Sequence, residues 1–173
     1  ITGACCLLAE VDPDAIQQRV ADGYIDPKNI YKSLPEIFSA AARFSNPERG
    51  IALVYAGNIV DLWEYAANQN IQVHLGSDQT SLHNIDDLGY CPVGYSFAEA
   101  KDLLMQDKLA FMDAVHASLR RQVDAINTLS QRGMYFWDYG NAFLKEAGNA
   151  NALIWRDSAQ LQYKYPSYVE DIM

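Results

Sequence analysis

Residues 51–58 read Ile-Ala-Leu-Val-Tyr-Ala-Gly-Asn, and this stretch indicates the fold class. The apolar run predicts a strand over residues 51–56 that is buried on both faces. Gly57 and Asn58 end the run, and residues 59–68 follow as a predicted helix with Asn58 as its N-cap. A strand that is apolar on both faces and leads directly into a helix is typical of a parallel sheet covered by helices.

The same alternation continues on both sides of this stretch. On the N-terminal side we predict one strand and two helices: a strand over 4–11, a helix from Asp12-Pro13 to Gly23, and a helix from a Ser33–Glu36 capping box to Asn46-Pro47. On the C-terminal side we predict strands over 71–75 and 134–137, a helical region from Ser96 to Arg132 with a break near Asp107, a helix over 142–147, and a candidate strand over 152–155. The predicted fold class is therefore α/β, with a doubly wound, mainly parallel sheet and helices on both faces, in one domain over residues 1–173.

A stripe of apolar residues runs along the long helical region. Its members recur at helical spacing: Leu104, Phe111, Val115, Leu119, Val123, Ile126 and Leu129. Such a stripe serves either core packing or a dimer surface, and we expect core packing.

The composition excludes several classes of protein. The chain has 173 residues and a net charge of −9, which argues against nucleic acid as a partner. Its longest apolar runs are far shorter than the roughly 20 residues of a membrane span. The three cysteines, Cys5, Cys6 and Cys91, fit a reduced compartment better than a secreted disulfide framework. Neither His74 nor His116 has a partner at metal-ligand spacing. Because the chain begins without Met and ends on an apolar run, we expect it to be part of a longer protein.

Polar residues follow four of the predicted strands. They are Glu10, Gly57-Asn58, residues 77–83 and residues 138–141, and the loops of a parallel sheet's carboxyl ends share one edge. Glu10 is either a solvated strand end or a ribose ligand, and Asn58 is either an N-cap alone or part of a phosphate site. Tyr139 either packs or stacks on a flat ligand. The residues alone predict a nucleotide-binding or small-molecule α/β domain.

Several motifs resemble the urocanate hydratase (urocanase) family. The longer ones are GSDQTSLHN at 76–84 with YCPVG at 90–94, SLRRQ at 118–122, and FWDYGNAFL at 136–144. Shorter matches, AEVDP at 9–13, YAGN at 55–58 and YPSY at 165–168, occur in the same order. The resemblance covers almost the whole chain.

The resemblance implies a Rossmann-like NAD-binding domain in an enzyme that adds water to urocanate during histidine degradation. In this family NAD⁺ acts as an electrophile and returns unchanged, so the enzyme is a hydro-lyase. The family's NAD contacts fall on Glu10, Asn58, Ile59, Gln79, Thr80, Ser81, Leu82, His83, Tyr90, Cys91 and Tyr139 of this chain. The family also implies a cytoplasmic homodimer with a small-molecule substrate.

The chain departs from the family pattern in places. Some members have an arginine where this chain has Ala15, and nearby Arg19 is not a match. The family's Gly-rich loop would precede residue 1 and its catalytic cysteine would follow residue 173. The resemblance therefore implies that no catalytic residue lies in the chain, that Cys91 is not the nucleophile, and that the isolated chain is inactive. The alternatives are the NAD-binding domain of another enzyme, such as a dehydrogenase, and a non-catalytic nucleotide-binding module.

Overall fold

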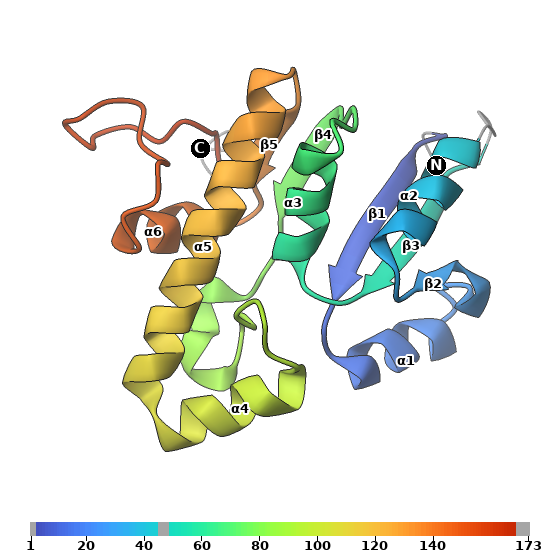
Figure 1. The fold of residues 1–173 in the computed structure, drawn as a ribbon, viewed down its shortest axis with the longest axis horizontal. Coiled ribbons are helices and arrows are strands. Elements are labelled where there is room, and N and C mark those ends of the chain that lie inside the picture. The colour runs from blue at the N-terminus through green and yellow to red at the C-terminus, as the bar shows by residue number, and fades with distance from the viewer. Residues whose placement is uncertain (1–2, 45–48, 169–173) are drawn as a thin grey trace. The chain divides into compact units, whose positions relative to one another are not determined.

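The regular strands of the described residues all pair in parallel (Figure 1). The structure is a computed structural model that describes residues 3–44 and 49–168. The chain divides into two compact units, residues 1–62 and residues 63–173, and each unit has a parallel sheet of its own. Parallel strands alternating with helices confirm the predicted α/β class. That residues 1–173 act as one domain stays a prediction.

The first unit contains a three-stranded sheet in the order β1-β3-β2. Its elements are β1 (Cys5–Glu10), α1 (Pro13–Ala21), the 3₁₀ helix η1 (Pro27–Asn29), β2 (Ile30–Tyr31), α2 (Leu34–Arg43), β3 (Ile51–Ala56) and the start of α3 (Ile59–Asn68). The register pairs Glu10 of β1 with Ala56 of β3. Both strands therefore end at the same edge of this sheet.

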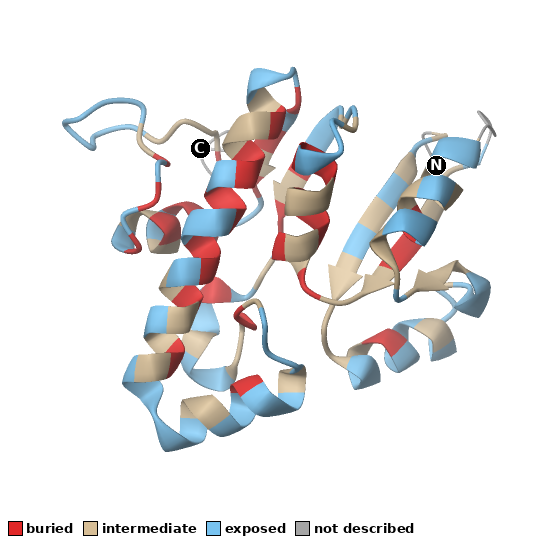
Figure 2. Ribbon diagram, in the orientation of Figure 1, coloured by how far each residue is buried: buried red, intermediate tan, exposed pale blue. Residues whose placement is uncertain are grey.

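One face of this sheet packs on α2. Ile37 of α2 and Leu53 of β3 belong to a buried cluster, and Cys5, Leu7 and Ala9 of β1 pack against that cluster. The alternate residues of β1 point the other way, and Cys6 among them is exposed. Figure 2 shows that this strand is nowhere fully buried.

Not all of the helix caps predicted for the first unit form. Asp12 caps α1 by accepting a hydrogen bond from the Asp14 N–H at 2.9 Å, as predicted. Ser33 lies at the N-cap of α2, but its side chain makes no capping bond, so the predicted capping box with Glu36 does not form. The predicted helix end at Asn46-Pro47 lies outside the described residues; α2 ends at Arg43.

The second unit contains a two-stranded sheet and the longest helix. Its elements after α3 are β4 (Leu75–Asp78), the 3₁₀ helix η2 (Leu82–Asp87), α4 (Phe97–Gln106), α5 (Lys108–Gln131), β5 (Tyr135–Asp138) and α6 (Ala142–Asn149). The register of β4 and β5 pairs Asp78 with Asp138. Within the described ranges, no helix combines the length and the apolar character needed to cross a bilayer.

The apolar stripe serves core packing, as predicted. Six of its seven members are almost fully buried in α5: Phe111, Val115, Leu119, Val123, Ile126 and Leu129. Leu104, on the preceding helix, is only partly buried. Phe136 of β5 adds an aromatic cluster, with ring centroids 5.1–6.2 Å from Tyr165, Phe143 and Trp63.

Two strand predictions were wrong and one strand was missed. The predicted strand over 71–75 shares only its last residue with β4, which continues through Gly76 to Asp78. Only a glycine fits at position 76, because a Cβ there would come within 2.8 Å of Cη2 of Trp63 and within 2.9 Å of the Met134 sulfur. Residues 152–155 contribute only an isolated antiparallel bridge between Trp155 and Tyr163. The two-residue strand β2 was not predicted, since so short a run has no periodicity.

Candidate functional site

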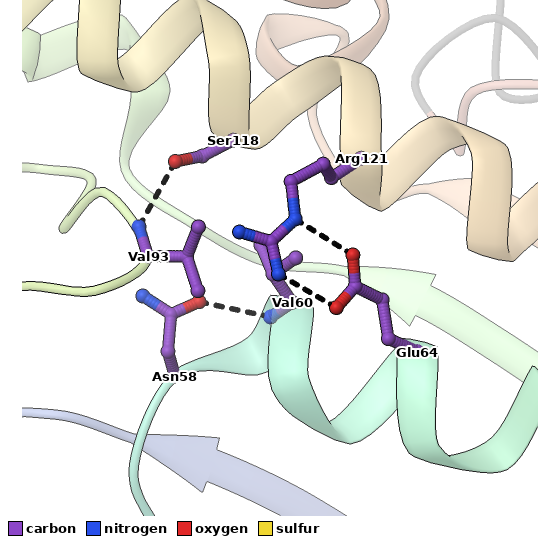
Figure 3. A network of polar contacts seen from close by, with 6 residues as sticks. All are labelled: Asn58, Val60, Glu64, Val93, Ser118 and Arg121. Carbon is purple, nitrogen blue, oxygen red and sulfur yellow. Dashed lines mark hydrogen bonds and ion pairs between the residues drawn. The ribbon is translucent and has the colours of Figure 1, made fainter. Parts of the chain in front are cut away.

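The carboxyl edge of the first sheet carries three of the predicted ligand residues. Glu10 ends β1, and its Oε1 accepts a hydrogen bond from the Asp12 N–H at 2.9 Å. In the described part of the chain, no donor contacts its second oxygen, Oε2. Asn58 is buried, and its Oδ1 accepts the Val60 N–H at 2.9 Å, so it does cap α3 (Figure 3). Ile59 is the first residue of that helix, where backbone N–H groups lack helical partners.

The carboxyl edge of the second sheet is organised by two buried aspartates. Asp78 and Asp138 are each only 3% exposed. Oδ1 of Asp78 accepts from the N–H and the hydroxyl of Thr80, and Oδ1 of Asp138 accepts from the Gly140 N–H at 3.1 Å. The Tyr139 N–H donates to the carbonyl oxygen of Asp78 at 3.2 Å. The loops after β4 and β5 therefore begin side by side, each turned by the aspartate that precedes it.

A second bond from Asp138 begins α6. Its Oδ2 accepts the Leu144 N–H at 3.1 Å, at the third position of the helix. Asn141 occupies the N-cap position with φ of +68° but makes no side-chain capping bond. The buried carboxylate therefore takes over the capping role.

Next to these loops lies a groove of about 590 Å³. It is lined from η2, the start of α5 and the start of α6, and its polar side chains include His83, Asn84, Lys108, Asn141, Lys145 and Glu146. Lys108 pairs with Asp86 at 2.7 Å. Amide, imidazole and ammonium groups are the kinds of donor that bind phosphate and ribose oxygens.

The residues of the loop at 79–83 face in different directions. Gln79, Ser81 and His83 are exposed, whereas Leu82 is buried. The Thr80 hydroxyl is already bonded to Asp78. Polar side chains of this loop are therefore accessible to a ligand, while Leu82 holds the loop to the core.

The predicted contacts at 90–91 have side chains that face inward. The Tyr90 hydroxyl donates to Oε1 of Gln122 at 2.9 Å, and burial, followed by the nearby Asp78 charge, raises the pKa of Tyr90 well above its usual value. The Cys91 thiol is buried and lies 3.6 Å from the carbonyl oxygen of Tyr95. These side chains are committed to the interior of the second unit.

Tyr139 is 54% exposed and stacks on Tyr168. The two ring centroids are 5.5 Å apart and the rings are nearly parallel, with an interplanar angle of 5°. Tyr139 thus both packs and remains accessible, as the two interpretations of this residue require.

Comparison with known proteins decides the family. The sequence matches the urocanase Rossmann-like domain family over residues 1–172. The chain belongs to this family. The resemblance inferred from the motifs, and the Rossmann-like class, are therefore confirmed.

Similar sequences include named urocanate hydratases. They are a probable urocanate hydratase of Dictyostelium discoideum, 45% identical over 175 residues, and the urocanate hydratases of Mus musculus (41% over 179) and Homo sapiens (40% over 179). Each alignment covers 100% of this chain but 26% of the relative. The urocanase domain described here therefore spans about a quarter of the length of these relatives.

The structure of this urocanase domain adds residues that the sequence did not single out as site residues. Oδ2 of Asp78 accepts the Gln122 Nε2–H at 2.7 Å. The Ser118 hydroxyl accepts the Val93 N–H at 2.9 Å (Figure 3). Burial raises the pKa of Asp78, the bonds from Thr80 and Gln122 lower it, and the Asp138 charge raises it again. A signal for Ser118 and Gln122 was present: they are polar residues four positions apart within the buried face of a helix.

Proposed function

We propose that this chain is the NAD-binding domain of a urocanate hydratase, which adds water to urocanate to give imidazolonepropionate. The observation that carries the proposal is the family match over residues 1–172, joined by relatives of that name at 40–45% identity across the whole chain. The polar residues at the carboxyl edges of the two sheets support it, since ligands of open α/β sheets bind at such edges.

The donors and acceptors at these edges fit a dinucleotide. Glu10 has a carboxylate oxygen, Oε2, to which no described residue donates, and such an oxygen accepts hydrogen bonds from ribose hydroxyls. A 2′-phosphate would face this carboxylate, so we expect NAD to be preferred over NADP. The start of α3 at Ile59 offers backbone N–H groups to the pyrophosphate. Because the chain has a net charge of −9, affinity for a dinucleotide depends on such local donors.

The second unit carries the predicted contacts at 79–83, 90–91 and 139. Gln79, Ser81 and His83 present exposed polar side chains, and Tyr139 presents an exposed ring beside Gly140. Thr80 and Leu82 would act mainly through the backbone, because the hydroxyl of one is bonded to Asp78 and the side chain of the other is buried. For Tyr90 and Cys91 we likewise propose backbone contacts.

When bound, NAD⁺ supplies an electrophilic nicotinamide ring to the hydration reaction. This chain's own residues would bind and orient the dinucleotide, and we assign no catalytic residue within residues 1–173. We expect the isolated chain to be inactive, and the full-length enzyme to be a cytoplasmic homodimer.

The test uses the full-length protein and urocanate. The proposal predicts that the near-UV absorbance of urocanate disappears while no net NADH absorbance develops. Accumulation of NADH with an alcohol or hydroxy-acid substrate, without loss of urocanate, would instead indicate a dehydrogenase. Binding of NAD without any turnover of urocanate would indicate a non-catalytic nucleotide-binding module.

A further inference from the structure

A buried amide lies in the middle of the apolar face of α5. Gln122 is 0% exposed and has Leu119, Val123 and Ile126 as buried neighbours on the same helix. A buried amide is costly unless its groups are hydrogen-bonded. Gln122 is bonded at both ends: its Nε2 donates to Oδ2 of Asp78 at 2.7 Å, and its Oε1 accepts from the Tyr90 hydroxyl at 2.9 Å.

Each partner of Gln122 belongs to a segment that contains predicted cofactor contacts. Asp78 is the last residue of β4 and holds the Thr80 N–H at 2.9 Å, which sets the direction in which the 79–83 loop leaves the strand. Tyr90 begins the 90–94 segment. The chain of bonds from Tyr90 through Gln122 to Asp78 therefore joins the two segments through α5.

Two further contacts support this arrangement. One turn before Gln122, the Ser118 hydroxyl accepts the Val93 N–H at 2.9 Å (Figure 3). The same hydroxyl donates to the Ala114 carbonyl at 2.7 Å. The residues that adjoin the two segments are also bonded to each other, since the Gly89 N–H donates to the Asn84 carbonyl at 3.0 Å. Ser118 and Gln122 thus form one polar face of α5 that anchors residues 90–93 and the end of β4.

We propose that Gln122, together with Tyr90 and Asp78, is a positioning group that orients the 79–83 loop for cofactor binding. The side chains of these three residues do not themselves contact the cofactor. The identity of the cofactor as NAD rests on the function proposed above. Loss of the Gln122 amide would leave a buried carboxylate oxygen of Asp78 without a donor, and the loop that Asp78 turns would lose its fixed direction.

The test uses the full-length protein and four variants: Gln122→Met, which keeps the side-chain length; Tyr90→Phe, which keeps the ring; the double variant; and Tyr95→Phe as a control. Tyr95 is a partly exposed tyrosine of the same connecting segment and takes no part in the bonded chain. Amide hydrogen exchange of the 79–83 loop measures its order independently of any ligand. Calorimetry with NAD measures affinity, and thermal unfolding measures global stability.

We expect Gln122→Met to speed exchange in the 79–83 loop and to weaken NAD binding, each by about tenfold, the size expected for losing a hydrogen bond to a charged acceptor. Tyr90→Phe should act in the same direction with a smaller effect, because it removes a bond between neutral groups. In the double variant, the fold-loss of NAD affinity should not exceed the product of the two single-variant fold-losses. It should lie close to that of Gln122→Met alone, because both substitutions act through one chain of bonds. Tyr95→Phe should match the wild type in all three measurements.

A purely structural role would lower the unfolding temperature while leaving loop exchange and NAD affinity of the folded protein unchanged, and that result would overturn the proposal. If Gln122→Met fails to fold, Tyr90→Phe decides by the same two readouts. If the wild type itself does not bind NAD, the proposed function fails, and the exchange measurement still decides whether Gln122 orients the loop.

Discussion

Asp138 offers the sharpest test of how the second unit is built. Its carboxylate is 3% exposed and holds two backbone N–H groups, those of Gly140 and Leu144, each at 3.1 Å. The substitution Asp138→Ala removes both bonds at once. It leaves the buried Leu144 N–H, at the start of α6, without an acceptor.

The expected loss in the free energy of unfolding is about 2–4 kcal/mol. A helix cap contributes about 0.5–2 kcal/mol, and leaving a buried donor unsatisfied costs about 1–3 kcal/mol. Relief from burying a charged carboxylate offsets part of the sum. Asp107→Ala is the matched control, because Asp107 caps α5 through one exposed bond to the Ala110 N–H at 3.0 Å and should cost about 1 kcal/mol.

Urea unfolding followed by tryptophan fluorescence reports on the correct part of the chain. The chain has three tryptophans, Trp63, Trp137 and Trp155, and all of them belong to the second unit. The fluorescence transition therefore measures this unit even where the first unit unfolds separately. If Asp138→Ala cost no more than Asp107→Ala, the assignment of α6 capping to the buried carboxylate would be refuted.

Three further predictions concern the second unit. Gly89→Ala should lower the urea midpoint and Gly140→Ala should not, since a Cβ at Gly89 would collide with two backbone carbonyl oxygens and one at Gly140 meets no atom within 4 Å. Asp78 has a raised pKa in the folded state, so at pH values between its unfolded and folded pKa the folded state binds more protons than the unfolded state. The wild type should therefore lose stability relative to Asp78→Asn as pH rises from about 4 through the folded pKa, in urea titrations at several pH values. Gln79→Ala and Tyr139→Phe should each weaken NAD binding less than Glu10→Ala in calorimetry, because each removes a neutral group.

Elements with their own local signals could be predicted from the sequence. The bounds of β3 and α3 agree with the prediction, because an apolar run ends at Gly57 and Asn58 supplies a cap. The break between α4 and α5 also falls where it was expected, since Asp107 ends one helix and caps the next. Such signals depend only on neighbouring residues.

The position of β4 could not be predicted in this way. Its residues Gly76, Ser77 and Asp78 have low strand propensity, and they form a strand because they pair with β5. The buried position of Asp78 further requires donors from Thr80 and from Gln122, which is 44 residues away along the chain. Tertiary partners of this kind leave no local pattern.

Only part of the candidate site could be predicted from the sequence. The rule that ligands bind at the carboxyl ends of parallel strands predicted one shared edge for Glu10, Asn58, the 79–83 loop and Tyr139. The structure has two sheets instead: Glu10 and Asn58 follow strands of the first, and the 79–83 loop and Tyr139 follow strands of the second. A pattern of strands and helices along the chain does not show which strands share a sheet. The inward direction of the Tyr90 side chain depends on Gln122 and could not be seen in the sequence.

Calorimetric titration of the full-length protein with NAD tests the central claim most directly. Wild-type protein should bind NAD, and Glu10→Ala should weaken binding by roughly 1.5–3 kcal/mol, the scale of hydrogen bonds to a charged group. Glu36→Ala, at an exposed glutamate of α2, should bind as the wild type does. Residues 1–173 alone should bind NAD much more weakly than the full-length protein. Absence of NAD binding would show that this is not an NAD-binding domain, and equal affinity of the wild type and Glu10→Ala would show that Glu10 does not bind the ribose.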